Sequence, residues 1–154
     1  SEKMLDFYEI EKNITEKTRL DFCAYLTEKG IEEPSYCTDE PLDLDKYKAD
    51  FAVFLDFASF SFDELSSDSQ KTKLTLDVYF VRRNGESAKL KSSLLAITSA
   101  FYAWFYGKEE PCINRDFHGV VDFATISEVN FYDAVSGSTN IKIAQITIEA
   151  EVES

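Results

Sequence analysis

The chain has 154 residues, of which 14% are aromatic, and it can therefore build a substantial hydrophobic core; this composition excludes a chain that is disordered over most of its length. Its 29 acidic and 16 basic residues give a formal net charge of −13, which disfavours direct binding to nucleic acid because such a surface repels phosphate groups. Three cysteines without C-x-x-C spacing exclude a zinc ribbon and a thioredoxin-like motif, and no apolar run approaches membrane-spanning length.

We interpret residues 1–154 as a single domain that begins with a helix over residues 2–29. Apolar residues from Met4 to Leu26 recur at helical spacing, and Gly30 follows them. The phase of these apolar positions slips between Asn13 and Thr18, so one bent helix and two short helices both fit. We favour one long helix.

Residues 31–48 are predicted to form an acidic connector with two prolines. The carboxylates between Asp39 and Asp45 alternate as in a calcium loop, but the glycine and the closing glutamate of such a loop are missing. We therefore expect a solvated loop that is attached to the sheet through Tyr36 and Tyr47.

An αβ core is predicted over residues 50–152, and its first strands are expected at 51–57 and 74–81. Both runs alternate apolar residues with a period of two and are rich in β-branched and aromatic side chains. The apolar spacing shifts phase after Phe57, which predicts a bulge or bend near Phe60 and Phe62.

The central helix is predicted between Ser87, as its cap, and Gly107, as its stop. Its apolar stripe runs from Leu90 to Trp104, and we expect Phe101 and Trp104 to lie in the core.

Two further strands are predicted around Val121 to Phe131 and over residues 140–152, separated by a turn at residues 136–138. A change of parity between Ile143 and Ile146 predicts a bulge near Ala144. The predicted fold is α+β: a four-stranded, mainly antiparallel sheet in the order α-β-β-α-β-β, with the helices packed on one face.

No catalytic, cofactor-binding or metal-binding motif is present, and we predict that the protein is not an enzyme and has no cofactor. The nearest approach to a catalytic pair is Cys112 with His118, the one histidine of the chain, but no nucleophile motif surrounds the cysteine. A structural cysteine beside a loop histidine is the favoured interpretation.

A predicted subunit interface lies on the outward face of the sheet. If the strand parities hold, this face carries large side chains whose exposure would indicate a contact surface. The alternative is that the N-terminal helix or the acidic connector covers them. The predicted interface residues are Phe54, Phe60, Phe62, Tyr79, Val81 and Tyr132.

Residues 47–57, with the sequence YKADFAVFLDF, resemble a segment of small tailed-phage proteins. The aromatic pair Phe60 and Phe62, the polar loop with Gln70, the strand at 74–81 and the closing strand at 140–152 are similar to theirs as well. The chain thus resembles the tail-terminator and tail-completion (minor tail) family. The resemblance implies a non-enzymatic subunit that forms a ring, typically of six copies, as a tail terminator or head–tail connector.

The resemblance also implies partners and a location. The partners would be other copies of the chain and tail-tube or neck proteins, without direct contact to nucleic acid or membrane. The location would be the bacterial host cytoplasm during assembly and then the virion tail. The competing hypothesis is a small acidic binding module, such as an immunity-type inhibitor or a nucleic-acid mimic, that binds a basic partner as a monomer.

Overall fold

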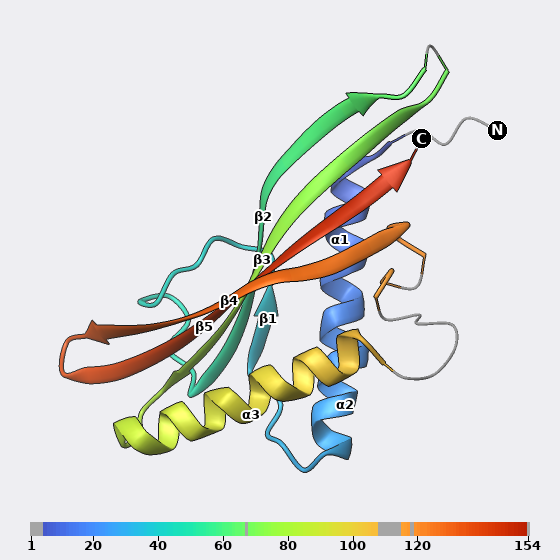
Figure 1. Ribbon diagram of the computed structural model, residues 1–154. Helices are drawn as coiled ribbons and strands as arrows, with labels where there is room; N and C mark the ends of the chain where they lie inside the picture. The colour runs from blue at the N-terminus through green and yellow to red at the C-terminus, as the bar shows by residue number, and fades with distance from the viewer. Residues whose placement is uncertain (1–4, 67, 108–114, 118, 154) are drawn as a thin grey trace.

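The computed structural model describes residues 5–66, 68–107, 115–117 and 119–153 (Figure 1). A long helix near the N-terminus is followed by three strands, a second helix and two further strands. In chain order the elements are α1 (Phe7–Lys17), the π-helical turn η1 (Thr18–Phe22), α2 (Cys23–Glu28), β1 (Tyr36–Thr38), β2 (Phe51–Glu64), β3 (Gln70–Arg83), α3 (Ser87–Phe105), β4 (Phe123–Ser136) and β5 (Thr139–Glu153).

The sheet has five strands in the order β1-β2-β3-β5-β4, so the predicted four-stranded antiparallel sheet is wrong. The four long strands pair antiparallel with one another, and β1 pairs in parallel with the beginning of β2, which makes the sheet mixed. The predicted element order missed β1, because three residues are too few for an alternating pattern to stand out. At about 3.3 Å per residue, the long strands extend about 45 Å.

The N-terminal helix is one continuous element of 22 residues, as favoured from the sequence. Five of its buried positions, Ile10, Ile14, Thr18, Phe22 and Leu26, recur at every fourth residue. In an α-helix each such step overshoots a full turn by about 40°, so five positions would drift around the helix. The wider π turn at Thr18–Phe22 corrects this drift and keeps Phe22 and Leu26 toward the sheet.

Both helices pack against the same face of the sheet and share one core with it (Figure 1). Phe22 is fully buried, and its ring lies 5.7 Å from that of Phe80, 5.2 Å from that of Phe101 and 5.5 Å from that of Trp104. The prediction that Phe101 and Trp104 are core residues is therefore confirmed. This aromatic cluster joins the N-terminal helix, β3 and α3.

The opposite, outward face is partly covered by the acidic connector. Leu44 and Tyr47 pack on a second apolar cluster, formed by Ala52, Phe54, Val81, Ile141 and Ile143. Tyr36 and Tyr47 are in ring contact, as are Tyr47 and Phe54, so these tyrosines do attach the connector to the sheet. The guanidinium of the buried Arg83 donates a 2.7 Å hydrogen bond to the carbonyl of Leu44.

The bulges lie partly where they were predicted. The register of β2 shifts between Phe57 and Ser59, as expected, but β5 continues past Ala144 without a shift, and the second bulge lies in β4 between Ile126 and Glu128. The parity change of β5 has another cause: its first residues are buried under the connector, whereas its later residues are buried under the helices.

The start of α3 also differs from the prediction. Ser87 is the first helical residue, Glu86 occupies the cap position, and no side chain caps the helix.

Candidate functional site

The sheet register places four of the six predicted interface residues on the outward face. Phe54 pairs with Tyr79, while Val81 and Tyr132 both pair with Ile143. However, Phe54 and Val81 are each only 1% exposed, because Leu44 and Tyr47 cover them. These two residues are part of the core of the chain itself.

Phe60 and Phe62 lie on the other face, the one that the helices cover. The bulge after Phe57 reverses the parity of β2, so Phe60 pairs with Leu74 and joins the main core. The ring of Phe7 in α1 lies 4.5 Å from that of Phe60 and 5.9 Å from that of Phe62. Phe62 remains 48% exposed beyond this contact.

Tyr79 and Tyr132 are the two predicted residues that remain accessible on the outward face. They flank Gln145, to which the Tyr132 hydroxyl donates a 2.8 Å hydrogen bond. Burial, followed by the nearby carboxylates of Asp77 and Asp56, raises the pKa of Tyr79. The uncovered part of this face is thus polar and acidic, with a pair of tyrosines.

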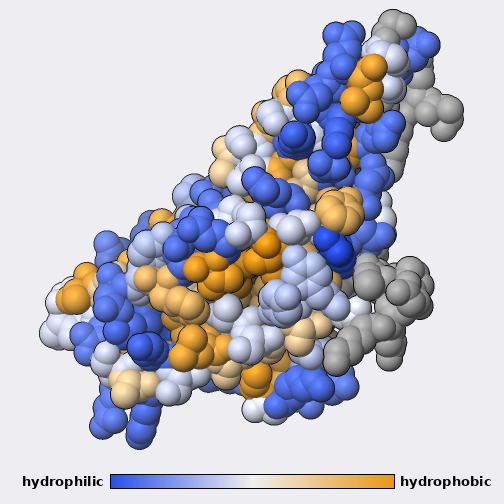
Figure 2. Space-filling model, viewed as in Figure 1, coloured by the Kyte–Doolittle hydropathy of each residue, from blue (hydrophilic) through white to orange (hydrophobic). Residues whose placement is uncertain are grey.

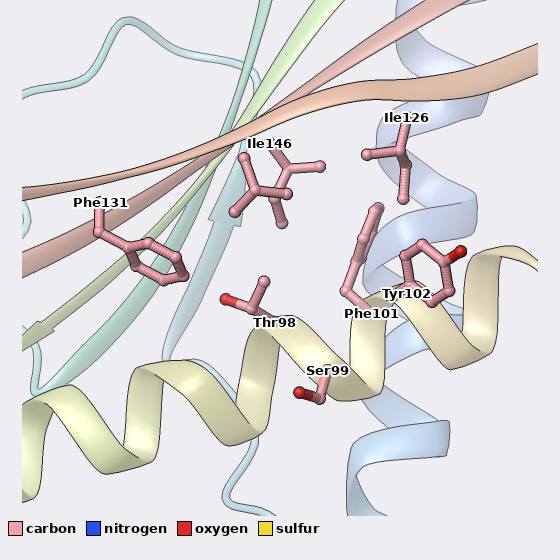
Figure 3. Close-up of a pocket in the computed structure, with 8 residues that line it drawn as sticks. Thr98, Ser99, Phe101, Tyr102, Ile126, Phe131 and Ile146 are labelled. Atoms are coloured by element: carbon pink, nitrogen blue, oxygen red, sulfur yellow. The ribbon is translucent and has the colours of Figure 1, made fainter.

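An apolar groove opens on the helix side of the sheet, between α3 and the edge strand β4. Figure 2 shows hydrophobic side chains gathered in this region, and Figure 3 shows the residues of α3 facing those of β4 and β5 across it. The cavity volume is about 370 Å³. Its lining residues are Thr98, Ser99, Phe101, Tyr102, Ile126, Val129, Phe131 and Ile146.

The groove exists because α3 covers β3 and β5 but does not reach across the whole of β4. Phe101 and Ile146 are buried, whereas Tyr102 and Phe131 are 58% and 50% exposed. Beside the groove, the Tyr106 hydroxyl accepts a 2.8 Å hydrogen bond from the Ile126 backbone N–H.

The first residues of β4 are protected at their edge by Arg115. Its guanidinium lies over the rings of Tyr106 and Phe123, and its Nε donates a 2.5 Å hydrogen bond to the carbonyl of Ala124. In the part of the chain that the structure describes, no strand pairs with the outer edge of β4. Its residues 127–136 therefore present backbone hydrogen-bonding groups at an open edge.

Charge is distributed unevenly around this groove. Residues 87–107, which include all of α3, contain Lys89 and Lys91 but no aspartate or glutamate, although the chain has 29 of these. Among the described residues, no charged side chain lines the groove, and the hydroxyl of Thr98 donates to the Leu94 carbonyl within the helix. The groove is suited to an apolar side chain rather than to acid–base chemistry.

Other clusters of titratable side chains give weaker evidence of a functional site. Glu11, Asp39 and Asp56 lie close together, and burial, followed by Asp39 and then Asp56, raises the pKa of Glu11. Within the described residues, no group of three or more His, Cys, Asp or Glu side chains is arranged to hold a metal ion. Cys112 and His118, the pair considered from the sequence, lie outside the described residues.

Comparison with known proteins does not assign the chain to a family. A scan against models of protein families found no match, and a search of curated proteins found no significant match. None of the helices in the described ranges combines the length and the apolar character needed to cross a bilayer.

The sequence-based interpretation missed the groove. The sequence pattern predicts a strand that contains Val129 and Phe131, and it predicts a core position for the apolar face of α3. Whether a groove forms between them depends on how far the helix reaches across the sheet. One signal was available: a segment of 21 residues without a carboxylate, in a chain with a net charge of −13.

Proposed function

We propose that this protein is a non-enzymatic structural subunit that assembles with copies of itself into a ring in the tail of a tailed phage, as a tail terminator or head–tail connector. Tail-tube or neck proteins would be its other partners. It would assemble in the cytoplasm of the bacterial host and remain in the virion tail. The resemblance described above supplies the phage assignment, and the β4 edge supports the assembly.

The observation that carries the proposal is the open edge of β4. Soluble proteins protect edge strands by covering or capping them, because an open edge pairs readily with another chain. Arg115 and Tyr106 cap β4 only as far as Ile126. Beyond that point Val129 and Phe131 are exposed on one face, and Tyr132 is exposed on the other. An open edge flanked by exposed aromatic rings is typical of a strand that pairs in an assembly.

The acidic binding module remains the second candidate, and the outward face favours it. Asp56, Asp77 and Glu149 lie on the part of this face that the connector leaves uncovered. Such a surface attracts a basic partner, and the attraction weakens as salt rises.

Absolute mass in solution, measured by light scattering over a wide range of concentration, tests the proposal. We expect a species of roughly six times 17.6 kDa, or a mass that rises with concentration toward it. A chain that stays monomeric at every concentration and salt, and that binds a basic protein in low salt, would contradict self-assembly and support the binding module.

A further inference from the structure

We infer that the open edge of β4, at residues 127–136, binds an extended segment of a partner protein in which apolar and basic residues alternate. The segment adds a strand to the sheet, with its apolar side chains in the groove beside α3 and its basic side chains on the outward face. This inference goes beyond the proposed function, because it assigns the edge to a partner protein and holds whether or not copies of the chain form a ring.

The exposed apolar surface along β4 has the length of a strand. Val129, Phe131 and Val135 lie at alternate positions on the helix-side face and are 36%, 50% and 68% exposed. At about 3.3 Å per residue, Val129 and Val135 are about 20 Å apart. An added strand of about seven residues covers this length and also pairs with the backbone groups of the edge, which a small apolar ligand in the groove does not do.

The groove accepts the apolar side chains of such a strand. Figure 3 shows Phe131 of β4 on one side of the groove and Thr98 and Tyr102 of α3 on the other. The Thr98 hydroxyl already donates a hydrogen bond within the helix, so an apolar neighbour leaves it paired. Asp133, the carboxylate on this face of β4, is ion-paired with Lys142. Because α3 contains two lysines and no carboxylate, basic side chains of the segment are disfavoured on this side of the edge.

The outward side of the same edge is acidic. Glu128 is exposed at the beginning of the open part, and at its end Ser136 donates a 3.0 Å hydrogen bond to the carboxylate of Asp45 in the connector. β4 contains no lysine or arginine, and Arg115 lies over Phe123, before the open part begins. Basic side chains on the outward side of an added strand therefore meet carboxylates near both ends of the edge.

A second copy offers no strand of this kind at its open edges. Among the described residues, the long strands with an open outer edge are β4 and the part of β2 beyond β1. β2 contains three carboxylates and β4 contains two, and neither strand contains a lysine or an arginine. Pairing of these edges between copies brings like charges together, so a basic partner protein is the favoured occupant. In the proposed assembly, copies of the chain then meet through other surfaces.

Fluorescence anisotropy with a labelled peptide of about nine residues that alternates lysine with valine tests the inference. We expect saturable binding, with a Kd below about 1 mM that rises with salt. N-methylation of either all the lysine amides or all the valine amides tests strand pairing, because alternate N–H groups of a strand point to opposite sides. One methylated peptide should lose binding and the other should keep it. The same affinity for both would overturn strand addition.

Two charged variants distinguish the edge from general attraction to an acidic chain: Phe131→Glu in the groove and Tyr132→Glu as its control. Tyr132 is the next residue on the strand and is similarly exposed, at 46%, but it lies on the outward face. Each variant adds one negative charge, and thermal unfolding verifies that each folds. We expect Phe131→Glu to weaken peptide binding about tenfold or more, and Tyr132→Glu to bind the peptide at least as tightly as the original chain. Tighter binding by both variants, or weaker binding by Tyr132→Glu alone, would place the peptide on the outward face and overturn the inference.

Light scattering without peptide tests the ring separately. If the ring forms and the peptide does not bind, the inference fails and the proposed function stands. If the chain stays monomeric and binds the peptide as described, the inference stands and the ring fails. If Phe131→Glu instead abolishes association between copies of the chain, the edge belongs to a second copy and the inference is overturned.

Discussion

At the scale of single residues, Arg83 decides the state of the outward face. It is only 4% exposed, and its guanidinium bonds to the backbone carbonyls of Leu44 and Tyr47, 39 and 36 residues away along the chain. Without these bonds the connector would be held mainly by the packing of Leu44 and Tyr47. Arg83 thus helps to keep Phe54 and Val81 inside the chain.

Replacing Arg83 with methionine should lower the free energy of unfolding by about 2–3 kcal/mol, because charge-assisted hydrogen bonds are lost and two carbonyls lose their donor. Trypsin should then cut faster after Lys46 and Lys48 in the connector. Urea unfolding and timed proteolysis measure both effects. Arg19→Met, at an exposed ion pair with Glu16, is the control and should cost less than about 1 kcal/mol. Unchanged proteolysis in Arg83→Met would show that packing alone holds the connector.

The two cysteines of the described region have thiols of low reactivity. Burial, followed by the charge of Glu33, raises the pKa of Cys23 to about 11, and burial, followed by Cys23, raises the pKa of Cys37 to about 12. The thiolate, which is the reactive form, is then a fraction of only about 10⁻⁴ to 10⁻⁵ at pH 7.

In a Cys112→Ser variant, we expect both remaining thiols to react with a maleimide or a disulfide reagent at least about 100-fold more slowly than in urea. Their rates should rise about tenfold per pH unit through neutral pH, because each unit raises the thiolate fraction tenfold. Fast labelling of either thiol in the folded chain at pH 7 would contradict these pKa shifts. The same assay on the original chain shows whether Cys112 is unusually reactive, as the enzyme hypothesis requires.

At the scale of elements, the π turn determines how the N-terminal helix meets the sheet. Phe22, at the end of η1, contacts Phe80, Phe101 and Trp104. Leu20, two residues earlier in the same turn, is 60% exposed. Residues two apart point to opposite sides of the helix, so Phe22 enters the core while Leu20 stays in solvent.

Phe22→Ala should destabilise the chain by about 3–5 kcal/mol, since it removes a fully buried ring from an aromatic cluster. Leu20→Ala, the matched control in the same turn, should change the free energy of unfolding by no more than about 0.5 kcal/mol. Urea unfolding of both variants gives the comparison. Equal losses in the free energy of unfolding would mean that Phe22 is not buried more deeply than Leu20.

At the scale of the whole molecule, the net charge of −13 opposes the meeting of two copies. In the proposed assembly, apolar burial would have to overcome this repulsion, which is long-ranged in low salt, where the Debye length is about 30 Å at 0.01 M. A basic partner would instead be attracted to the chain, most strongly in low salt.

Self-association should therefore strengthen as salt rises from about 0.01 M to about 1 M, where the Debye length falls to about 3 Å. Sedimentation or light scattering at fixed protein concentration measures this. Weaker association at high salt would indicate that charge attraction, and not apolar burial, dominates the contact.

Local pattern in the sequence was enough to determine much of the fold. The long N-terminal helix, the bulge after Phe57, the core positions of Phe101 and Trp104 and the shared face of Phe54, Tyr79, Val81 and Tyr132 all follow from periodicity, which reflects which side of an element is buried. The numbers of acidic and basic residues likewise determine the net charge, and this charge disfavours partners that are themselves acidic.

Only the tertiary structure decided what covers each face. β1 is too short to show a period, and its place beside β2 comes from long-range pairing. Whether Phe54 is exposed depends on a connector held by Arg83, and the groove depends on how far α3 extends across β4. Periodicity reports that a side chain is buried or exposed on one side of its own element, but the partner that buries it is set by packing between distant segments.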